Sequence, residues 1–158
     1  MAELGTQAIG AAGELLVQYK LIKHGIDSAR LTTDSGIDLV MYIPGTTEAH
    51  TVQVKAIVSP FLDGGTGPLV AGWILPRTCK AQWLAGVDIS RDRAWLFPIE
   101  EALHHARGTK KDVWLYWRLE EPRGKVVGVE SDYDAYDFDL VIDRLLGREL
   151  GDEEPELP

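Results

Sequence analysis

Two apolar runs joined by a Pro-Gly turn constrain the fold of this chain more than any other feature. The runs Ile37–Ile43 and His50–Val58 are rich in Val, Ile, Leu and Met, and the segment Pro44–Thr47 between them has turn composition. Together they predict a β-hairpin. Both strands carry apolar residues on both faces, as strands in the middle of a sheet do. We therefore expect the hairpin to lie centrally in the fold.

Three polar side chains are expected on one face of this hairpin, because alternate residues of a strand point to the same side. Asp38 lies in the first strand, and Gln53 and Lys55 lie in the second. If Ile43 pairs with His50, Asp38 stands directly opposite Lys55, whereas a register shifted by two residues places it opposite Gln53. A one-residue shift would separate the groups. The simplest alternative is an ordinary Asp–Lys pair on a solvated face.

A helix is predicted over Thr6–His24 and is ended by Gly25. Its Glu14 falls on the apolar side, away from the lysines, where a carboxylate needs a partner. Gly10 and Gly13 lie on the same side and allow close approach of backbone or ligand. Glu14 is therefore a candidate ligand, the alternative being a carboxylate at the edge of the apolar stripe that reaches water.

These residue types suit a hard cation. Mg²⁺ prefers oxygen ligands and keeps several waters, so one or two carboxylates with carbonyl oxygens suffice. The expected ligands are Asp38, the side-chain oxygen of Gln53 and the backbone carbonyl of Val54, with Glu14 in support, and Mn²⁺ is an expected substitute. Lys55 would orient or deprotonate a water and balance the negative charge that develops on a phosphate.

The remaining segments alternate between predicted strands and short helices. Strands are expected at Ser28–Thr32, Leu69–Leu75, Val87–Ser90, Ala94–Ile99 and Val113–Leu119, and helices at Thr78–Ala85, Glu100–Arg107 and Asp137–Leu146. The expected fold class is α/β, a mixed central sheet with helices on both faces. No composition shift divides the chain, so we expect one domain over residues 1–150 and an acidic tail over 151–158.

The net charge of −9 at pH 7 is unevenly distributed. Eleven acidic and two basic residues lie in Glu130–Pro158, which leaves the rest of the chain neutral. A neutral body permits local basic patches, and Arg91, Arg93, Lys110 and Lys111 are the candidate phosphate contacts. No apolar run is long enough to span a bilayer and no signal-peptide pattern is present, so no membrane partner and a cytoplasmic location are expected.

Aromatic residues and the single cysteine need separate interpretation. Most of the five tryptophans are expected in the core. Trp114, Tyr116 and Arg118 alternate on one face of a predicted strand, which suggests either a base-stacking surface or a dimer surface. Cys79 excludes an internal disulfide and a cysteine-based zinc site, and, with no evident base near it in sequence, it is interpreted as structural.

The motifs together resemble the PD-(D/E)XK nuclease superfamily. They are Gly13-Glu14-x-x-Val17, Leu21-Ile22-x-x-Gly25, Gly36-Ile37-Asp38-Leu39-Val40 and Val52-Gln53-Val54-Lys55, within residues 8–57. The arrangement is similar to that of archaeal Holliday junction resolvases and of some restriction and homing endonucleases, in the branch with a Gln-x-Lys ending. Ile37 stands where the family name places a Pro before the Asp.

The resemblance implies a restriction endonuclease-like fold and Mg²⁺-dependent hydrolysis of duplex or branched DNA, in many relatives by a homodimer. It implies Glu14 as the helix carboxylate, Asp38 as the metal-binding Asp and Lys55 as the catalytic lysine. Gln53 replaces the commoner Glu, and its uncharged oxygen predicts weaker metal affinity. Two other interpretations stay open. One is a nuclease-like fold that binds nucleic acid or a protein without cutting, and the other is a small interaction domain with a structural Asp38–Lys55 ion pair.

Overall fold

Two β-sheets form the centre of the molecule in the computed structural model, which describes residues 2–33, 35–120 and 128–148. The first, within these residues, has five strands in the order β1 (Asp27–Arg30), β2 (Leu39–Tyr42), β3 (Ala49–Ile57), β6 (Trp83–Asp88) and β7 (Arg93–Pro98). The second has three strands, likewise within the described residues, in the order β4 (Phe61–Leu62), β5 (Leu69–Pro76) and β8 (Asp112–Arg118). The acidic tail expected at 151–158 lies outside the described residues.

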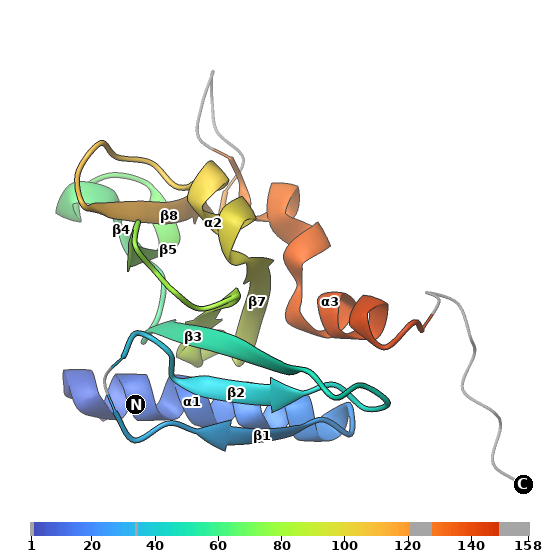
Figure 1. Ribbon diagram of the computed structural model, residues 1–158. Helices are drawn as coiled ribbons and strands as arrows, with labels where there is room; N and C mark the ends of the chain where they lie inside the picture. Colours follow the sequence, from blue (N-terminus) through green and yellow to red (C-terminus); the bar gives the residue numbers. More distant parts are fainter. Residues whose placement is uncertain (1, 34, 121–127, 149–158) are drawn as a thin grey trace, which may run out of the picture.

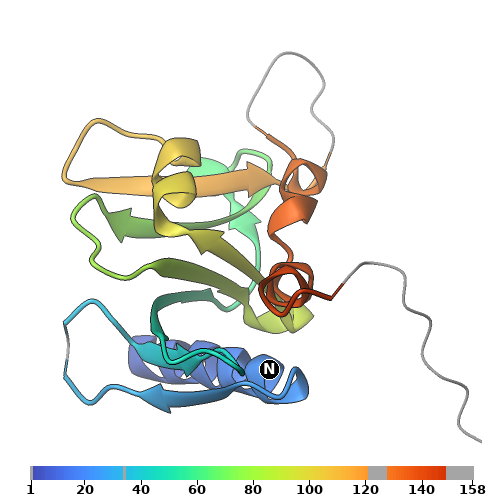
Figure 2. The same cartoon turned by 45° about the vertical axis from the view of Figure 1, so that its right-hand side comes forward.

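Helices cover both faces of the five-stranded sheet. They are α1 (Thr6–Lys23), α2 (Ile99–His105) and α3 (Phe138–Leu145), with 3₁₀ turns η1 (Asp63–Gly65), η2 (Ile89–Arg91) and η3 (Glu130–Tyr136). Figures 1 and 2 show α1 at one side of the molecule and β4, β5 and β8 at the opposite side. None of the helices in the described part of the chain is both long and apolar enough to cross a membrane.

A separate apolar core lies on each face of the five-stranded sheet. The first joins α1 and α3 to the sheet, through side chains that include Val17, Leu21, Leu39, Met41, Phe138 and Ile142. The second joins the sheet to β5, β8 and α2, and includes Trp73, Trp95, Phe97, Leu115 and Trp117. Because β3 pairs antiparallel with β2 and parallel with β6, the sheet is mixed, and the predicted α/β class is confirmed.

The helix predicted at Thr78–Ala85 is wrong. Residues from Trp83 onward form β6, which pairs with β3 and with β7. The error arises because a short apolar run has the same pattern in a buried strand and in a buried helix, so long-range pairing decides between them. At Gly86 a Cβ would lie 2.9 Å from the Trp73 ring, so the absent side chain makes room for that ring over β6.

The hairpin has the alternative register. Tyr42 pairs with Ala49 and Leu39 with Val52, which places Asp38 opposite Gln53 and makes Lys55 the diagonal neighbour. His50 pairs with Met41 rather than with Ile43, whose carbonyl accepts hydrogen bonds from the backbone N–H and the hydroxyl of Thr46 in the turn. The pairing is shifted by two residues, so the parity of the polar face is preserved.

Two contacts fix α1 in place. Gly13 lies against β3, where a Cβ would be 2.7 Å from the Cβ of Ala56. At the other end, Lys20 Nζ and His24 Nε2 each lie 2.8 Å from a carboxylate oxygen of Asp139 in α3. Burial alone would raise the pKa of Asp139, but hydrogen bonds from Lys20 and His24 outweigh it and hold the pKa below its usual value.

The two glycines of α1 offer a matched test of this close contact. Gly13→Ala should lower the free energy of unfolding by about 1–3 kcal/mol, because the new Cβ must displace β3. Gly10→Ala should raise it by about 0.5–1 kcal/mol, since nothing lies within 4 Å of its Cβ position and alanine favours the helix. Urea unfolding followed by tryptophan fluorescence measures both. Equal stabilisation by the two alanines would contradict the close packing of α1 on β3.

Candidate active site

Asp38 is held by the backbone of β3. Its N–H donates to the Val52 carbonyl at 3.0 Å, which extends the β2–β3 pairing by one residue. Its carboxylate Oδ2 accepts a hydrogen bond from the Val54 N–H at 2.7 Å. The hydrogen bond to Oδ2 orients the side chain, and Oδ1 takes no part in it. The negative charge therefore has a fixed position at the start of β2.

Gln53 lies beside Asp38 on the same face and is only 6% exposed. Its side-chain oxygen accepts a hydrogen bond from the thiol of Cys79, with Sγ 3.0 Å from Oε1. Cys79 lies in the connection between β5 and β6, 26 residues further along the chain. No local motif predicts this contact, so the interpretation of Cys79 as structural misses a neighbour of the predicted site.

Lys55 borders a hollow between β3 and the second sheet, with a volume of about 440 Å³. Phe61, Ile74 and Trp114 line the opposite side. In the parallel pairing, Gly86 of β6 lies beside Lys55, and the Trp73 ring that covers Gly86 also lines the hollow. The lysine thus extends from a central strand into a space with largely apolar walls.

Glu14 lies near the same end of the hairpin but is paired with an arginine. Its Oε2 is 2.7 Å from both Nε and Nη2 of Arg30, at the end of β1. Gly13, its neighbour, contacts Ala56 of β3, and β2 lies between β1 and β3. Glu14 therefore lies near the start of β2, but α1 packs on the sheet face that carries Leu39 and Val52, whereas Lys55 faces the second sheet on the other side. The Glu14 side chain is half-buried, with 20% of its surface exposed.

The four candidate phosphate contacts differ in their surroundings. Arg91 and Arg93 both bind the carboxylate of Glu130, and Arg91 also pairs with buried Asp88 at 2.6 Å. Burial would lower the pKa of Arg91, but the hydrogen bonds to Asp88 and Glu130 outweigh it and raise the pKa. Lys110, in contrast, lines an exposed hollow beside Trp114. Arg91 and Arg93 must therefore exchange ion pairs before they contact a phosphate.

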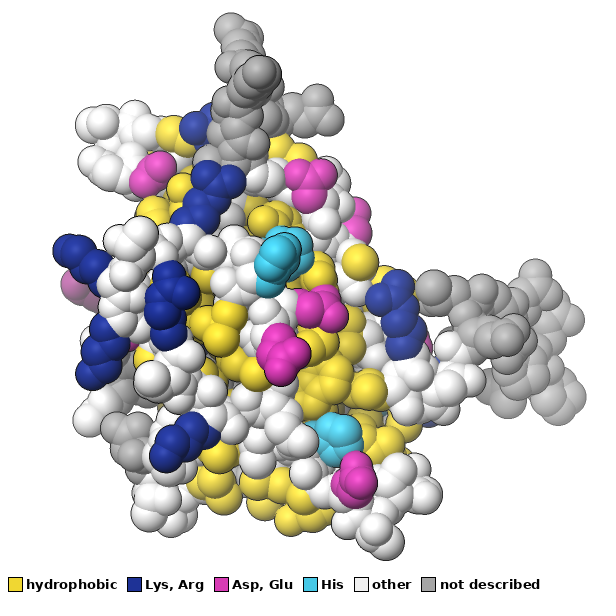
Figure 3. Space-filling model, turned by 45° about the horizontal axis from the view of Figure 1, so that its top comes forward, with side chains coloured by type: hydrophobic (Ala, Val, Ile, Leu, Met, Phe, Trp, Pro, Cys, Tyr) yellow, Lys and Arg dark blue, Asp and Glu magenta, His cyan; other side chains and the backbone are white. Residues whose placement is uncertain are grey.

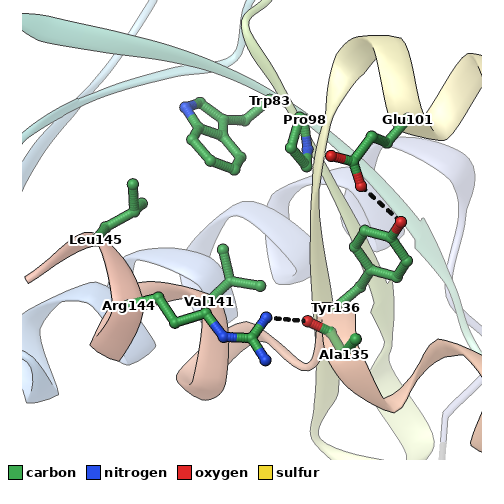
Figure 4. Close-up of a pocket in the computed structure, with 8 residues that line it drawn as sticks. All are labelled: Trp83, Pro98, Glu101, Ala135, Tyr136, Val141, Arg144 and Leu145. Carbon is green, nitrogen blue, oxygen red and sulfur yellow. Dashed lines mark hydrogen bonds between the residues drawn. The ribbon is translucent and has the colours of Figure 1, made fainter. Parts of the chain in front are cut away.

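A separate hollow, of about 330 Å³, lies beside α3 and away from the predicted site residues (Figure 4). It is lined by Trp83, Pro98, Glu101, Ala135, Tyr136, Val141, Arg144 and Leu145. Burial and a 2.5 Å hydrogen bond to Glu101 raise the pKa of Tyr136 to about 12, which keeps the phenol neutral. None of the predicted site residues lines this hollow, so it is distinct from the hairpin face.

The oxygen ligands near the hairpin are two carboxylates and one amide. No group of three or more His, Cys, Asp or Glu side chains suited to a metal occurs in the described part of the chain. Asp38 and Gln53 form a donor pair of the hard type that Mg²⁺ accepts with several retained waters. The donor chemistry of Asp38 and Gln53 fits the cation, whereas Glu14 lies on the α1 side of the sheet and is held by Arg30.

Comparison with known proteins identifies the fold. No protein-family model and no curated protein matches the chain. Among solved structures, a bacterial homing endonuclease, I-Ssp6803I, matches with a TM-score of 0.64 and 18% identity over 92% of this chain and 94% of that chain. Hjc, a Holliday junction resolvase from Archaeoglobus fulgidus, matches with a TM-score of 0.54 and 15% identity over 90% and 98%. The restriction endonuclease-like fold implied by the resemblance to PD-(D/E)XK nucleases is therefore confirmed.

Proposed function

We propose that this chain is a metal-dependent endonuclease that hydrolyses phosphodiester bonds of duplex or branched DNA. The observation that carries the proposal is the shared face of Asp38, Gln53 and Lys55 on the central hairpin. Its fold is that of a homing endonuclease and a Holliday junction resolvase, which supports the same class of reaction. A homodimer would supply two such sites for two strands, as the resemblance implies.

Each residue of the site has a role in this proposal. Asp38, the Gln53 side-chain oxygen and the Val54 carbonyl would hold Mg²⁺ or Mn²⁺, with Glu14 in support. The bound cation supplies charge stabilisation at the phosphate and lowers the pKa of a water. Lys55 Nζ orients the attacking water and balances the charge that develops on the phosphate oxygens. The Val54 N–H keeps the Asp38 carboxylate oriented before substrate binds.

DNA contacts outside the site are assigned to basic side chains around it. Lys110 and Lys111 are exposed in the connection before β8. They are the simplest phosphate contacts, because neither lysine forms an ion pair with a carboxylate among the described residues. Arg91 and Arg93 would contribute only when phosphate replaces Glu130. Electrostatic contacts of this kind fix the position of the duplex without reading its sequence.

A binding protein that does not cut is the second candidate, and two contacts favour it. The Gln53 side-chain oxygen accepts a hydrogen bond from the Cys79 thiol, and the Glu14 carboxylate is paired with Arg30. Both prospective metal ligands are therefore already bound to another side chain. An uncharged Gln also binds a cation more weakly than Glu. Metal-dependent cleavage separates this candidate from the nuclease.

The first test is cleavage of labelled duplex and four-way branched DNA with Mg²⁺ or Mn²⁺. Asp38→Asn and Lys55→Ala should each lower the cleavage rate by about 100-fold or more, because metal binding and charge stabilisation are lost. Asp38→Asn retains an oxygen that accepts from the Val54 N–H, so its free energy of unfolding should stay within about 0.5 kcal/mol of the parent. Asp38→Ala removes that acceptor and should cost about 1–3 kcal/mol.

The outcomes distinguish the candidates. DNA binding without cleavage under either metal would support the binding protein. Absence of both binding and cleavage, with Asp38→Ala strongly destabilising, would support the interaction domain with a structural Asp38. Neither result is compatible with the proposed nuclease.

The second test introduces a negative charge at position 53. Gln53→Glu places a second carboxylate beside Asp38, and the metal concentration for half-maximal cleavage should fall by about tenfold, since ligand charge sets affinity for hard cations. Titration calorimetry with Mn²⁺ gives a second readout that does not depend on cleavage. Gln53→Leu, of similar volume and without a ligand oxygen, is the matched control and should raise the required concentration. An unchanged metal requirement in both variants would remove Gln53 from the site.

A further inference from the structure

Two hollows meet at one aromatic residue beside Lys55. The first contains Lys55 and is closed on the far side by Phe61, Ile74 and Trp114. The second, of about 470 Å³, is lined by Arg107 and Lys110, and it also includes Ile74 and Trp114. Because the two hollows share these walls, they form a path over the outer face of the second sheet. The path runs from the candidate catalytic lysine to the exposed basic loop before β8.

The middle of this path is a row of aromatic rings. The ring centroids of Trp114 and Tyr116 lie 3.9 Å apart with an interplanar angle of 20°. Phe61 stacks on Trp114 with a 14° angle and a centroid separation of 6.3 Å. Phe61 is 38% exposed and neighbouring Ile74 is 62% exposed. The face is therefore apolar and partly open to solvent, with Trp114 and Tyr116 half-buried, and its rings are close to parallel.

Strand alternation and one glycine set these rings in place. In β8 the residues that alternate with Trp114 and Tyr116 are buried in the core, which leaves these two on the outer face. Gly72 is paired with Tyr116 in β5, and a Cβ there would lie 2.4 Å from the Tyr116 Cβ and 2.7 Å from the Trp114 Nε1. The rings lie directly over the backbone at Gly72, so their positions are fixed before any ligand arrives.

Charge along the path favours an anionic occupant. Lys55 lies at one end, Arg107 and Lys110 lie at the other, and Asp112 is the one acidic side chain among the described residues that line either hollow. Arg77 donates hydrogen bonds to the carbonyls of Lys110 and Gly108 and so steadies this basic loop. In Figure 3, several Lys and Arg side chains gather at the left, on the side where Figure 1 places β4 and β8.

We propose that the rings of Trp114, Tyr116 and Phe61 form a stacking platform for unpaired nucleotides of the DNA strand that Lys55 acts on. Cations at both ends with aromatic faces between them match phosphates that flank exposed bases. A fully paired duplex keeps its bases stacked inside and gains nothing from such a platform. The inference rests on the proposed nuclease function and specifies its substrate, which is DNA with single-stranded or unpaired nucleotides next to the cut.

The test compares binding of two labelled DNAs, a blunt duplex and the same duplex with a single-stranded overhang, by fluorescence anisotropy. All proteins carry Asp38→Asn so that the DNA stays intact in Mg²⁺. Trp114→Ala should weaken binding of the overhang DNA by about tenfold and change binding of the blunt duplex less than about twofold. Trp114→Phe should retain most of the affinity. Trp114→Leu, which keeps apolar bulk without a ring, should show the selective loss of the alanine variant.

Tyr19→Ala is the matched control, because Tyr19 is 59% exposed on α1, on the opposite side of the five-stranded sheet. It should change neither affinity. Equal weakening of both DNAs, no weakening, or full retention of overhang affinity by Trp114→Leu would each overturn the platform. A change from dimer to monomer in sedimentation velocity on Trp114→Ala would also overturn it and assign the face to self-association.

The result is separable from that of the cleavage test. If the unmodified chain cuts duplex DNA while Trp114→Ala shows no selective loss, the platform is wrong and the nuclease stands. If the chain does not cut any DNA while the overhang preference depends on Trp114, the nuclease is wrong and the platform stands as a single-strand binding site.

Discussion

The pairing of β3 on both edges and its packing on both faces is the constraint on which the rest of the structure depends. The strand hydrogen-bonds to β2 and β6, α1 packs on one face at Gly13, and the second sheet lies across the other. Gln53 and Lys55 lie on this strand, and Asp38 is held against it. A central strand that is paired on both edges moves little, so the backbone positions of Asp38 and Lys55 keep one relation to each other. Reactions that depend on fixed electrostatics need that kind of support.

The hairpin and its polar face could be predicted from the sequence, because strand parity is a local property. Alternation places Asp38, Gln53 and Lys55 on one side whichever of two registers is adopted, and the structure has the second of them. Long-range pairing could not be predicted in the same way. The pattern of the β6 run predicts a helix for part of it, and the division into two sheets does not follow from the sequence, because strand partners depend on contacts between distant segments.

The surroundings of the site residues were the least predictable part. The sequence predicts that Glu14, on the apolar side of its helix, needs a partner, and Arg30 at the end of β1 is that partner. The Cys79–Gln53 contact joins residues with no motif in common. Both are side-chain pairs between separate elements, and both occupy an oxygen that is a prospective metal ligand. A prospective metal ligand that already accepts a hydrogen bond must exchange that donor for the cation, which offsets part of the binding free energy.

Close approach at glycines brings Lys55 and the outer aromatic face of the second sheet near each other. Gly13 brings α1 onto one face of β3, and Gly86, beside Lys55, admits the Trp73 ring on the other. Trp73 Nε1 donates to the Val87 carbonyl at 3.1 Å, which fixes the ring as the floor of the Lys55 hollow. Gly72 then lets the outer rings lie against the next strand. Larger side chains at these positions would separate the layers, and Lys55 would face open solvent rather than a shaped path.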